Sequence, residues 1–155
     1  MSVLMKSNII ERIQKWRDSG STIVFTNGCF DILHRGHVHY LHEAKKLGGK
    51  WIVGLNSDLS VQRIKGRDRP FIPEDDREII LKSLAAVDEI LIFNEDTPLK
   101  LIEDVRPDIL VKGVDYSEDD IVGAELVKSL GGAVVVIPFL KGFSSSKIVN
   151  QIRNN

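Results

Sequence analysis

The sequence is poor in cysteine, in long apolar runs and in net charge, and each absence argues against a class of protein. The one cysteine, Cys29, cannot form an internal disulfide, which suits a reducing compartment. No segment approaches the ~20 apolar residues of a membrane span, and the first residues lack the apolar core of an export signal. The 21 basic and 22 acidic residues nearly cancel, which argues against a protein that coats a polyanion. We therefore expect a cytoplasmic protein without a membrane or nucleic-acid partner.

Internal repeats, low-complexity runs and linker-like segments are missing as well. A length of 155 residues then predicts one domain over residues 1–155. Apolar residues at helical spacing, ended by Ser19 and Gly20, indicate an N-terminal helix within residues 1–20. Residues 21–155 form the expected catalytic α/β core.

Strand-like and helix-like segments alternate through this core. The expected strands are 22–25, 50–55, 89–93, 108–111 and 133–137. One helix is expected to begin near residue 36, and four more are expected over 73–86, 99–105, 124–130 and 147–153. This order predicts a Rossmann-like three-layer α/β fold with a five-stranded parallel sheet and helices on both faces. Ligands of such folds bind at the carboxyl ends of the strands. The GxGxxG and Walker patterns are absent.

Two further segments have a marked pattern. Gln62–Pro70 holds four basic residues in nine around a central glycine, which is typical of a mobile cationic loop. The helix expected over 73–86 starts with proline and three acidic residues, which suit a helix N-terminus, and its apolar stripe is expected to be core. That stripe consists of Ile79, Ile80, Leu81 and Leu84.

All four histidines lie in the first strand–loop–helix unit, and they allow two interpretations. Imidazoles bind zinc, copper and nickel, so the cluster could be a metal site. However, His37 and His39 point about 200° apart on a helix that begins at residue 36, and the nearest acid, Asp31, precedes the turn. The alternative uses only His34 and His37, which face an anion held by the loop and the first helical turn, where free N–H groups and the helix dipole favour negative charge.

The motifs support the second interpretation through a family resemblance. TNGCFDILHRGHVHYL, which follows a strand and opens a helix, resembles the HxGH signature of the nucleotidyltransferase superfamily, which includes cytidylyltransferases, pantetheine-phosphate adenylyltransferase and class I aminoacyl-tRNA synthetases. The segments VGLNSD, KGRDRPFIP, PEDDR, VDEILIFNEDTP, RPDILVKGVDY and GFSSSKIV are similar to the adenylyltransferase domain of bacterial ADP-heptose synthesis. Two differences are Ser144–Ser146, where the family often has STT, and Val114–Asp115, where it has Gly-Asp.

The resemblance implies transfer of AMP from ATP to D-glycero-β-D-manno-heptose 1-phosphate, which gives pyrophosphate and ADP-heptose, a lipopolysaccharide precursor. It also implies a homodimer. The phosphate nucleophile needs no general base, so the site requires hydrogen-bond donors and cations. Mg²⁺ is expected to arrive with ATP, without dedicated metal ligands on the protein.

The candidate residues fall into three groups. The catalytic candidates are His34, His37, Lys65 and Arg77. The nucleotide-binding candidates are Thr26, Asn27, Gly28, Cys29, Phe30, His34, Gly36, His37, Lys112, Gly113, Asp115, Phe143, Ser144, Ser145 and Ser146. The candidates for the acceptor substrate are Asp31, Asn56, Asp58, Arg63 and Lys65. Structural roles are left open for Asp31, which could order the HRGH turn, for Asn56 and Asp58, which could cap a short helix, and for Cys29, which could simply be packed.

Two alternatives stay open at this stage. The same chemistry could act on glycerol 3-phosphate with CTP or on FMN with ATP. From a different class, the chain could be a non-catalytic nucleotide sensor or a metal-binding protein that keeps the fold.

Overall fold

The computed structural model describes residues 3–113 and 121–154, and its centre is a five-stranded sheet whose strands are all parallel. The order is β3-β2-β1-β4-β5, so the chain starts in the middle and builds outward in both directions. The strands are β1 (Ile23–Gly28), β2 (Lys50–Asn56), β3 (Glu89–Phe93), β4 (Ile109–Gly113) and β5 (Ala133–Ile137). The parallel five-stranded sheet predicted from the sequence is therefore confirmed.

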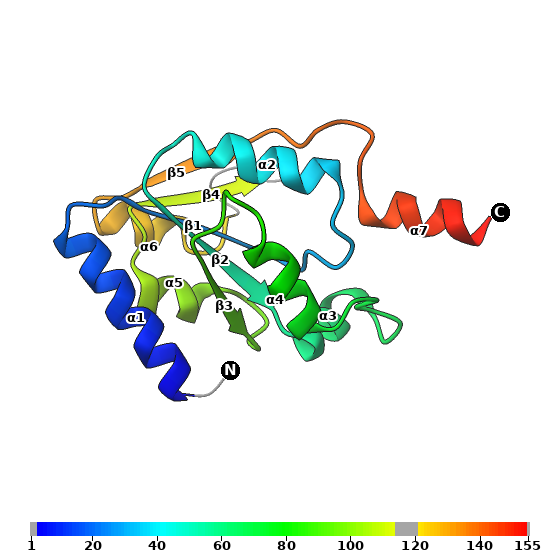
Figure 1. The fold of residues 1–155 in the computed structure, drawn as a ribbon, viewed down its shortest axis with the longest axis horizontal. Helices are drawn as coiled ribbons and strands as arrows, with labels where there is room; N and C mark the ends of the chain where they lie inside the picture. Colours follow the sequence, from blue (N-terminus) through cyan, green and yellow to red (C-terminus); the bar gives the residue numbers. More distant parts are fainter. Residues whose placement is uncertain (1–2, 114–120, 155) are drawn as a thin grey trace.

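Helices cover both faces of this sheet, which confirms the three-layer arrangement (Figure 1). Neighbouring residues of a strand point to opposite faces, so β1 sends Ile23 and Phe25 into one core and Val24 into the other. The first core is completed by α1 (Val3–Asp18), α5 (Leu99–Val105) and α6 (Ala124–Ser129). The second is completed by α2 (Arg35–Lys45) and α4 (Glu74–Lys82). Among the described residues, no helix is long and apolar enough to cross a membrane.

Acidic residues join the strands at the amino end of the sheet. Asp108, before β4, accepts the backbone N–H of Ile23 at 2.7 Å. Asp88, before β3, accepts the backbone N–H of Trp51 at 2.8 Å and an ammonium hydrogen of Lys45 at 2.7 Å. Each carboxylate thus satisfies an N–H that begins a neighbouring strand, which helps to fix the register.

The remaining helices lie near the carboxyl end of the sheet. The first, α3 (Asp58–Lys65), follows β2, and α7 (Ser145–Arg153) follows β5 and extends away from the body of the molecule (Figure 1). The prediction of a loop over 62–70 is wrong for residues 62–65, which are the last turn of α3. The reason is local, since Ser57 caps this helix by accepting the backbone N–H of Ser60 at 3.1 Å.

The prediction for the following helix also needs correction. It is shorter than expected, and Pro73 is its N-cap. Leu81 is buried as predicted, whereas Ile79 is 64% exposed and Ile80 is 38% exposed. Only one narrow stripe of α4 faces the sheet, so an apolar residue next to that stripe points to the surface.

Candidate active site

The loop from β1 to α2 forms the centre of the site, and His34 determines its shape. His34 is the N-cap of α2, with extended backbone angles, and its Nδ1 accepts the backbone N–H of Gly36 at 3.1 Å. A Cβ at residue 36 would lie 2.9 Å from the His34 ring and 3.0 Å from Cβ of Phe143, so this close approach requires glycine. Because Nδ1 accepts, the hydrogen of the neutral imidazole is on Nε2, which can donate to a ligand.

The rings of His34 and His37 stack on each other, with centroids 3.9 Å apart and planes 20° from parallel. Burial lowers the pKa of His37 to about 4, and His34 and Lys65 add to this shift, while a hydrogen bond that the ring donates to the backbone of Ile32 opposes it. Burial also lowers the pKa of His34. His37 is therefore neutral near pH 7, so it can stabilise a phosphate by hydrogen bonding without a full charge.

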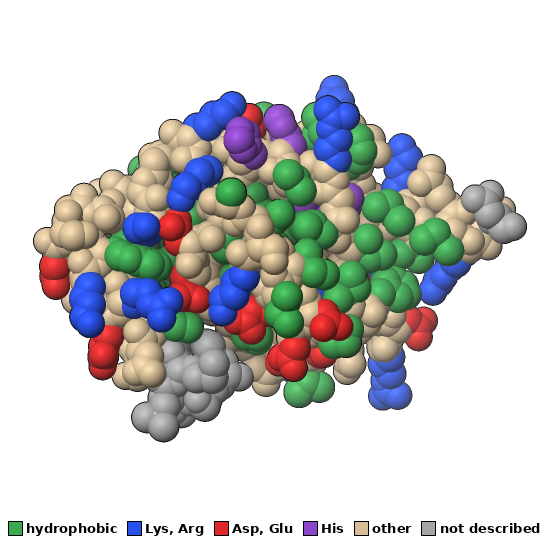
Figure 2. Space-filling model, in the orientation of Figure 1, with side chains coloured by type: hydrophobic (Ala, Val, Ile, Leu, Met, Phe, Trp, Pro, Cys, Tyr) green, Lys and Arg blue, Asp and Glu red, His purple; other side chains and the backbone are tan. Residues whose placement is uncertain are grey.

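The metal-site interpretation of the histidines finds no support in the described part of the chain. Over residues 3–113 and 121–154, no three His, Cys, Asp or Glu side chains are grouped so that they could hold a metal ion. Figure 2 shows histidine side chains on the surface over α2, among basic and acidic side chains that are mixed across this face.

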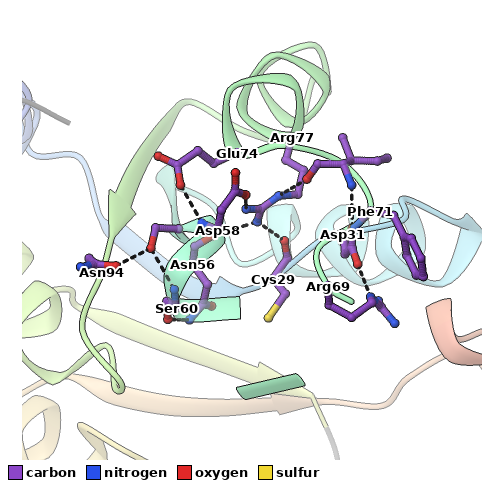
Figure 3. Close-up of polar contacts among 12 residues, drawn as sticks. Cys29, Asp31, Asn56, Asp58, Ser60, Arg69, Phe71, Glu74, Arg77 and Asn94 are labelled. Carbon is purple, nitrogen blue, oxygen red and sulfur yellow. Dashed lines mark hydrogen bonds and ion pairs between the residues drawn. The ribbon is translucent and has the colours of Figure 1, made fainter. Parts of the chain in front are cut away.

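Arg77, from α4, ties together the loops that follow β1 and β2 (Figure 3). Its side chain is 1% exposed and donates to the backbone carbonyls of Ile72 at 2.8 Å, Cys29 at 2.6 Å and Asn56 at 2.8 Å, and to Oδ1 of Asp58 at 2.7 Å. The guanidinium fork thus holds the floor of the site in place. Contact between Arg77 and a phosphate stays a prediction.

Asp31 is buried in a second network beside the first (Figure 3). Its carboxylate accepts the backbone N–H groups of Phe71 at 2.7 Å and Ile72 at 3.1 Å, and it pairs with Arg69. Asp31 therefore orders the segment before α4, whereas the structural role left open for it from the sequence was to order the HRGH turn. Its predicted contact with the acceptor stays a prediction.

The other acceptor candidates are placed differently. Lys65 borders two cavities of the site, and it has no hydrogen bond or ion pair with any described residue. Arg63 instead lies on the surface, where Nε donates to Asp96 at 2.7 Å. Neither Asn56 nor Asp58 caps α3, because Ser57 does; Nδ2 of Asn56 donates to the Ser60 hydroxyl at 3.0 Å.

The N-terminus of α7 lies next to that of α2. The hydroxyl of Ser145 donates to the backbone carbonyl of Ile32, just before α2, at 3.1 Å. Ser144 is the N-cap and accepts the backbone N–H of Lys147 at 3.1 Å. Phe143 lies near Arg35, whose guanidinium carbon is 5.8 Å from the ring centre. Two helix N-termini and the histidine pair thus surround one region, as expected for an anion site.

The nucleotide-binding candidates from β1 have distinct environments. Thr26 is buried and shares a 2.7 Å hydrogen bond with the Tyr40 hydroxyl, which holds α2 against the strand. Phe30 has its ring 5.1 Å from that of His37. Burial raises the pKa of the Cys29 thiol, while nearby Lys65 opposes the shift, so this cysteine is not an activated nucleophile.

At the end of β4, Lys112 donates from its ammonium group to Oδ1 of Asn27 on β1. Gly113 follows, and a Cβ at this position would lie 1.9 Å from the ring of Phe139, so glycine lets that ring cover the strand end. Asp115 lies outside the described residues.

Two cavities open at this end of the sheet and share four residues, His37, Lys65, Phe139 and Ser145. The larger, about 650 Å³, is otherwise lined by His34, Gly36 and residues 138–146. The smaller cavity, about 380 Å³, is otherwise lined by residues from the ends of β1, β2 and β4, from the loops after β1 and β3, and from α2 and α3. These residues are Asn27, Gly28, Cys29, Phe30, Asp31, Tyr40, Asn56, Ile64, Asp96, Pro98, Lys112 and Gly113. Sequence reasoning missed Asp96 and Pro98, although their place after β3 could have indicated them.

Comparisons with known proteins agree with this geometry. The family model described as cytidylyltransferase-like matches residues 25–151. The chain is 51% identical to the bifunctional protein HldE of Magnetococcus marinus over 92% of its length, and 48% identical to that of Wolinella succinogenes over 99%. It spans only 29% and 31% of those proteins.

Among solved structures, one titled as the lipopolysaccharide core biosynthesis protein from Thermoplasma volcanium is similar. It superposes with a TM-score of 0.63 and 35% sequence identity, covering 80% of this chain and 100% of that one. The fold, the histidine pair and these matches lead to one conclusion: the chain belongs to the cytidylyltransferase-like family of nucleotidyltransferases.

Proposed function

We propose that the chain transfers AMP from ATP to D-glycero-β-D-manno-heptose 1-phosphate and releases pyrophosphate. The observation that carries this proposal is the stacked pair of His34 and His37 at the junction of the two cavities. One cavity can hold a triphosphate and the other a phosphorylated acceptor, with the reacting phosphorus between them. The similarity to HldE proteins and the ordered motifs of heptose-phosphate adenylyltransferases support the choice of substrates.

In the proposed reaction, an oxygen of the acceptor phosphate attacks the α-phosphorus of ATP. The new P–O bond forms as the bond between the α-phosphorus and the bridging oxygen breaks, and the electron pair leaves with pyrophosphate. No proton must be removed, since a phosphate monoester is largely ionised near neutral pH, with a second pKa of about 6. Catalysis then depends on position and on hydrogen bonds to the developing charge.

Several residues have defined tasks in this proposal. Nε2 of His34 and the ring of His37 donate to the phosphates, and Lys65, at the boundary of the cavities, neutralises charge on the pyrophosphate or the acceptor. Backbone N–H groups at the start of α7, with Ser144 and Ser145, bind the terminal phosphates. Arg77 and Asp31 hold these loops in position.

Mg²⁺ is proposed to enter bound to ATP. The donors present fit this better than a resident ion, because the carboxylate of Asp31 is taken by Arg69 and two backbone N–H groups, and that of Asp96 by Arg63. The ion would supply positive charge that offsets the triphosphate. We also propose a cytoplasmic homodimer, and size-exclusion chromatography with light scattering measures its mass.

The test is pyrophosphate release with Mg²⁺ and each pairing of ATP, CTP or GTP with three acceptors: heptose 1-phosphate, glycerol 3-phosphate and FMN. Turnover confined to ATP and heptose 1-phosphate supports the proposal. Turnover with CTP and glycerol 3-phosphate would keep the chemistry but replace the substrates. Tight ATP binding without turnover of any pair would overturn the proposed activity and favour a nucleotide sensor.

A further inference from the structure

The two cavities differ in the chemistry of the residues that they do not share. The larger cavity has the N-termini of α2 and α7 and the His34 ring, but it is not bordered by Lys112. The smaller one has the carboxyl ends of β1, β2 and β4, with Asn27, Asn56 and Lys112. The first is therefore suited to a triphosphate, and the second combines a cation with amides that can bind sugar hydroxyls.

Lys112 is notable because it is a half-buried lysine whose hydrogen bond goes to a neutral amide. Six other ionisable groups line the smaller cavity: Cys29 and Asp31 after β1, His37 and Tyr40 from α2, Lys65 from α3 and Asp96 after β3. Neither carboxylate neutralises Lys112, because Asp31 is paired with Arg69 and Asp96 with Arg63. No carboxylate within residues 3–113 or 121–154 forms an ion pair with Lys112, and burial lowers its pKa to about 8.

A lysine in this position is costly unless an anion reaches it, because burial disfavours the ammonium ion. Its neighbour Asn27 orients the ammonium group without neutralising it. The cavity beside it, about 380 Å³, is open to a ligand and also bordered by Lys65. Two cations without carboxylate partners among the described residues therefore face one small cavity.

We propose that Lys112 binds the phosphate of the acceptor substrate in the smaller cavity, with Asn27 positioning its ammonium group. This inference rests on the proposed function for the identity of the sugar, and it separates Lys112 from the nucleotide-binding residues with which the sequence pattern grouped it.

The test titrates inorganic phosphate into the full chain saturated with Mg²⁺ and a non-hydrolysable ATP analogue, followed by calorimetry. A charged hydrogen bond of this kind changes affinity by roughly 10- to 100-fold. We expect Lys112→Met to weaken phosphate binding by that factor and to leave the affinity for the ATP analogue within threefold. Lys100→Met, on α5 and paired with Asp104 on the surface, is the matched control and should change neither affinity.

Asn27→Asp gives a second variant that keeps the lysine. The new carboxylate would pair with the ammonium group and repel phosphate, so phosphate affinity should again fall. If Lys112→Met does not fold, this variant tests whether Lys112 binds phosphate. At pH 9, phosphate binding by the wild type should take up part of a proton, because the anion favours the ammonium form; this uptake should vanish in Lys112→Met. A purely structural role would not produce it.

Phosphate binding that is unchanged in both variants would overturn the proposal, as would an equal loss of affinity for the ATP analogue. The probe does not depend on the sugar. A failure to turn over heptose 1-phosphate would therefore reject the proposed substrate, while the phosphate titration would still decide the role of Lys112.

Discussion

Charged side chains at the amino end of the parallel sheet have partners within the protein, whereas two lysines at the carboxyl end have no carboxylate partner among the described residues. At the amino end, Asp88 and Asp108 accept the N–H groups that begin neighbouring strands, and Asp88 also binds two lysines. At the carboxyl end, Lys65 and Lys112 have no carboxylate partner among the described residues, and His37 has a buried Nδ1 without a hydrogen bond of normal geometry. Charge is neutralised within the protein at one end and is available to a ligand at the other.

This difference shows where stability and activity should separate. A residue with satisfied partners contributes mainly to the free energy of unfolding, whereas a polar residue without partners lowers stability unless a ligand binds. The exceptions are the Arg77 network and the Asp31–Arg69 pair, which lie at the carboxyl end but are bonded within the protein. Mutations at both ends can test the comparison.

The largest effect is expected for Arg77→Met. Three backbone carbonyls and Asp58 lose a buried donor, so the free energy of unfolding should fall by roughly 3–5 kcal/mol. Urea denaturation measures this change. The control is Arg63→Met, an exposed arginine paired with Asp96, which should cost no more than about 1 kcal/mol. Equal losses in the two variants would mean that the buried network adds no stability.

His37→Asn should reduce kcat by about 10²–10³-fold, the usual cost of losing one donor to a transition-state oxygen. His42→Asn, on the exposed side of the same helix, should leave kcat unchanged. Initial rates of pyrophosphate release at pH 7 give both values. If the two variants had equal rates, the ring stacked on His34 would have no part in catalysis.

Lys112→Met should make the unliganded protein more stable while it weakens acceptor binding. The pKa of Lys112 falls from 10.5 in the unfolded chain to about 8 in the folded one. Above pH 10.5 the lysine is neutral in both states, so its burial does not lower the free energy of unfolding. As the pH falls toward 8 the unfolded chain takes up a proton that the folded one does not, and this stability is lost. Below pH 8 the variant should be more stable by roughly 3 kcal/mol, and the gap should narrow toward pH 10.5. Urea midpoints at pH 7 and pH 10 measure it; a constant gap would contradict the prediction.

Asp88→Asn, at the amino end, should lower the free energy of unfolding by about 1–2 kcal/mol without changing kcat. Burial raises the pKa of Asp88, but hydrogen bonds from Lys45, Trp51 and Lys50 outweigh it and hold that pKa below its usual range. The stabilisation is thus present above the unfolded pKa and is lost as the pH falls through the folded one. Urea denaturation at pH 7 and in acid should show that the difference in unfolding free energy between wild type and variant disappears at low pH. A change in kcat would contradict the prediction that the amino end affects stability alone.

The fold and the place of the HRGH segment at the start of a helix could be predicted from the sequence because both depend on local patterns. The alternation of strands and helices determines a parallel sheet, and the HRGH segment combines a cap, a glycine and two histidines within one turn. The partners of Arg77 and Asp31 could not be predicted. They join residues about 40 to 50 positions apart, and such contacts follow from the packing of α4 on the loop after β1.

The outcomes for α3 and α4 have a related cause. Composition indicated a loop over residues 62–70, but a capping serine before the charged stretch extended the helix to Lys65. In α4, the apolar residues Ile79 and Ile80 are exposed because the sheet meets only the neighbouring stripe of the helix, where Leu81 lies. Local propensity does not reveal which side of a helix meets the sheet.

The wall that the two cavities share has a kinetic consequence. His37, Lys65, Phe139 and Ser145 face both chambers, so in the proposed reaction the adenylyl group can pass directly from a nucleotide in one chamber to an acceptor in the other. Both substrates must then occupy the site together. Double-reciprocal plots should intersect, and labelled pyrophosphate should not exchange into ATP until the acceptor is added.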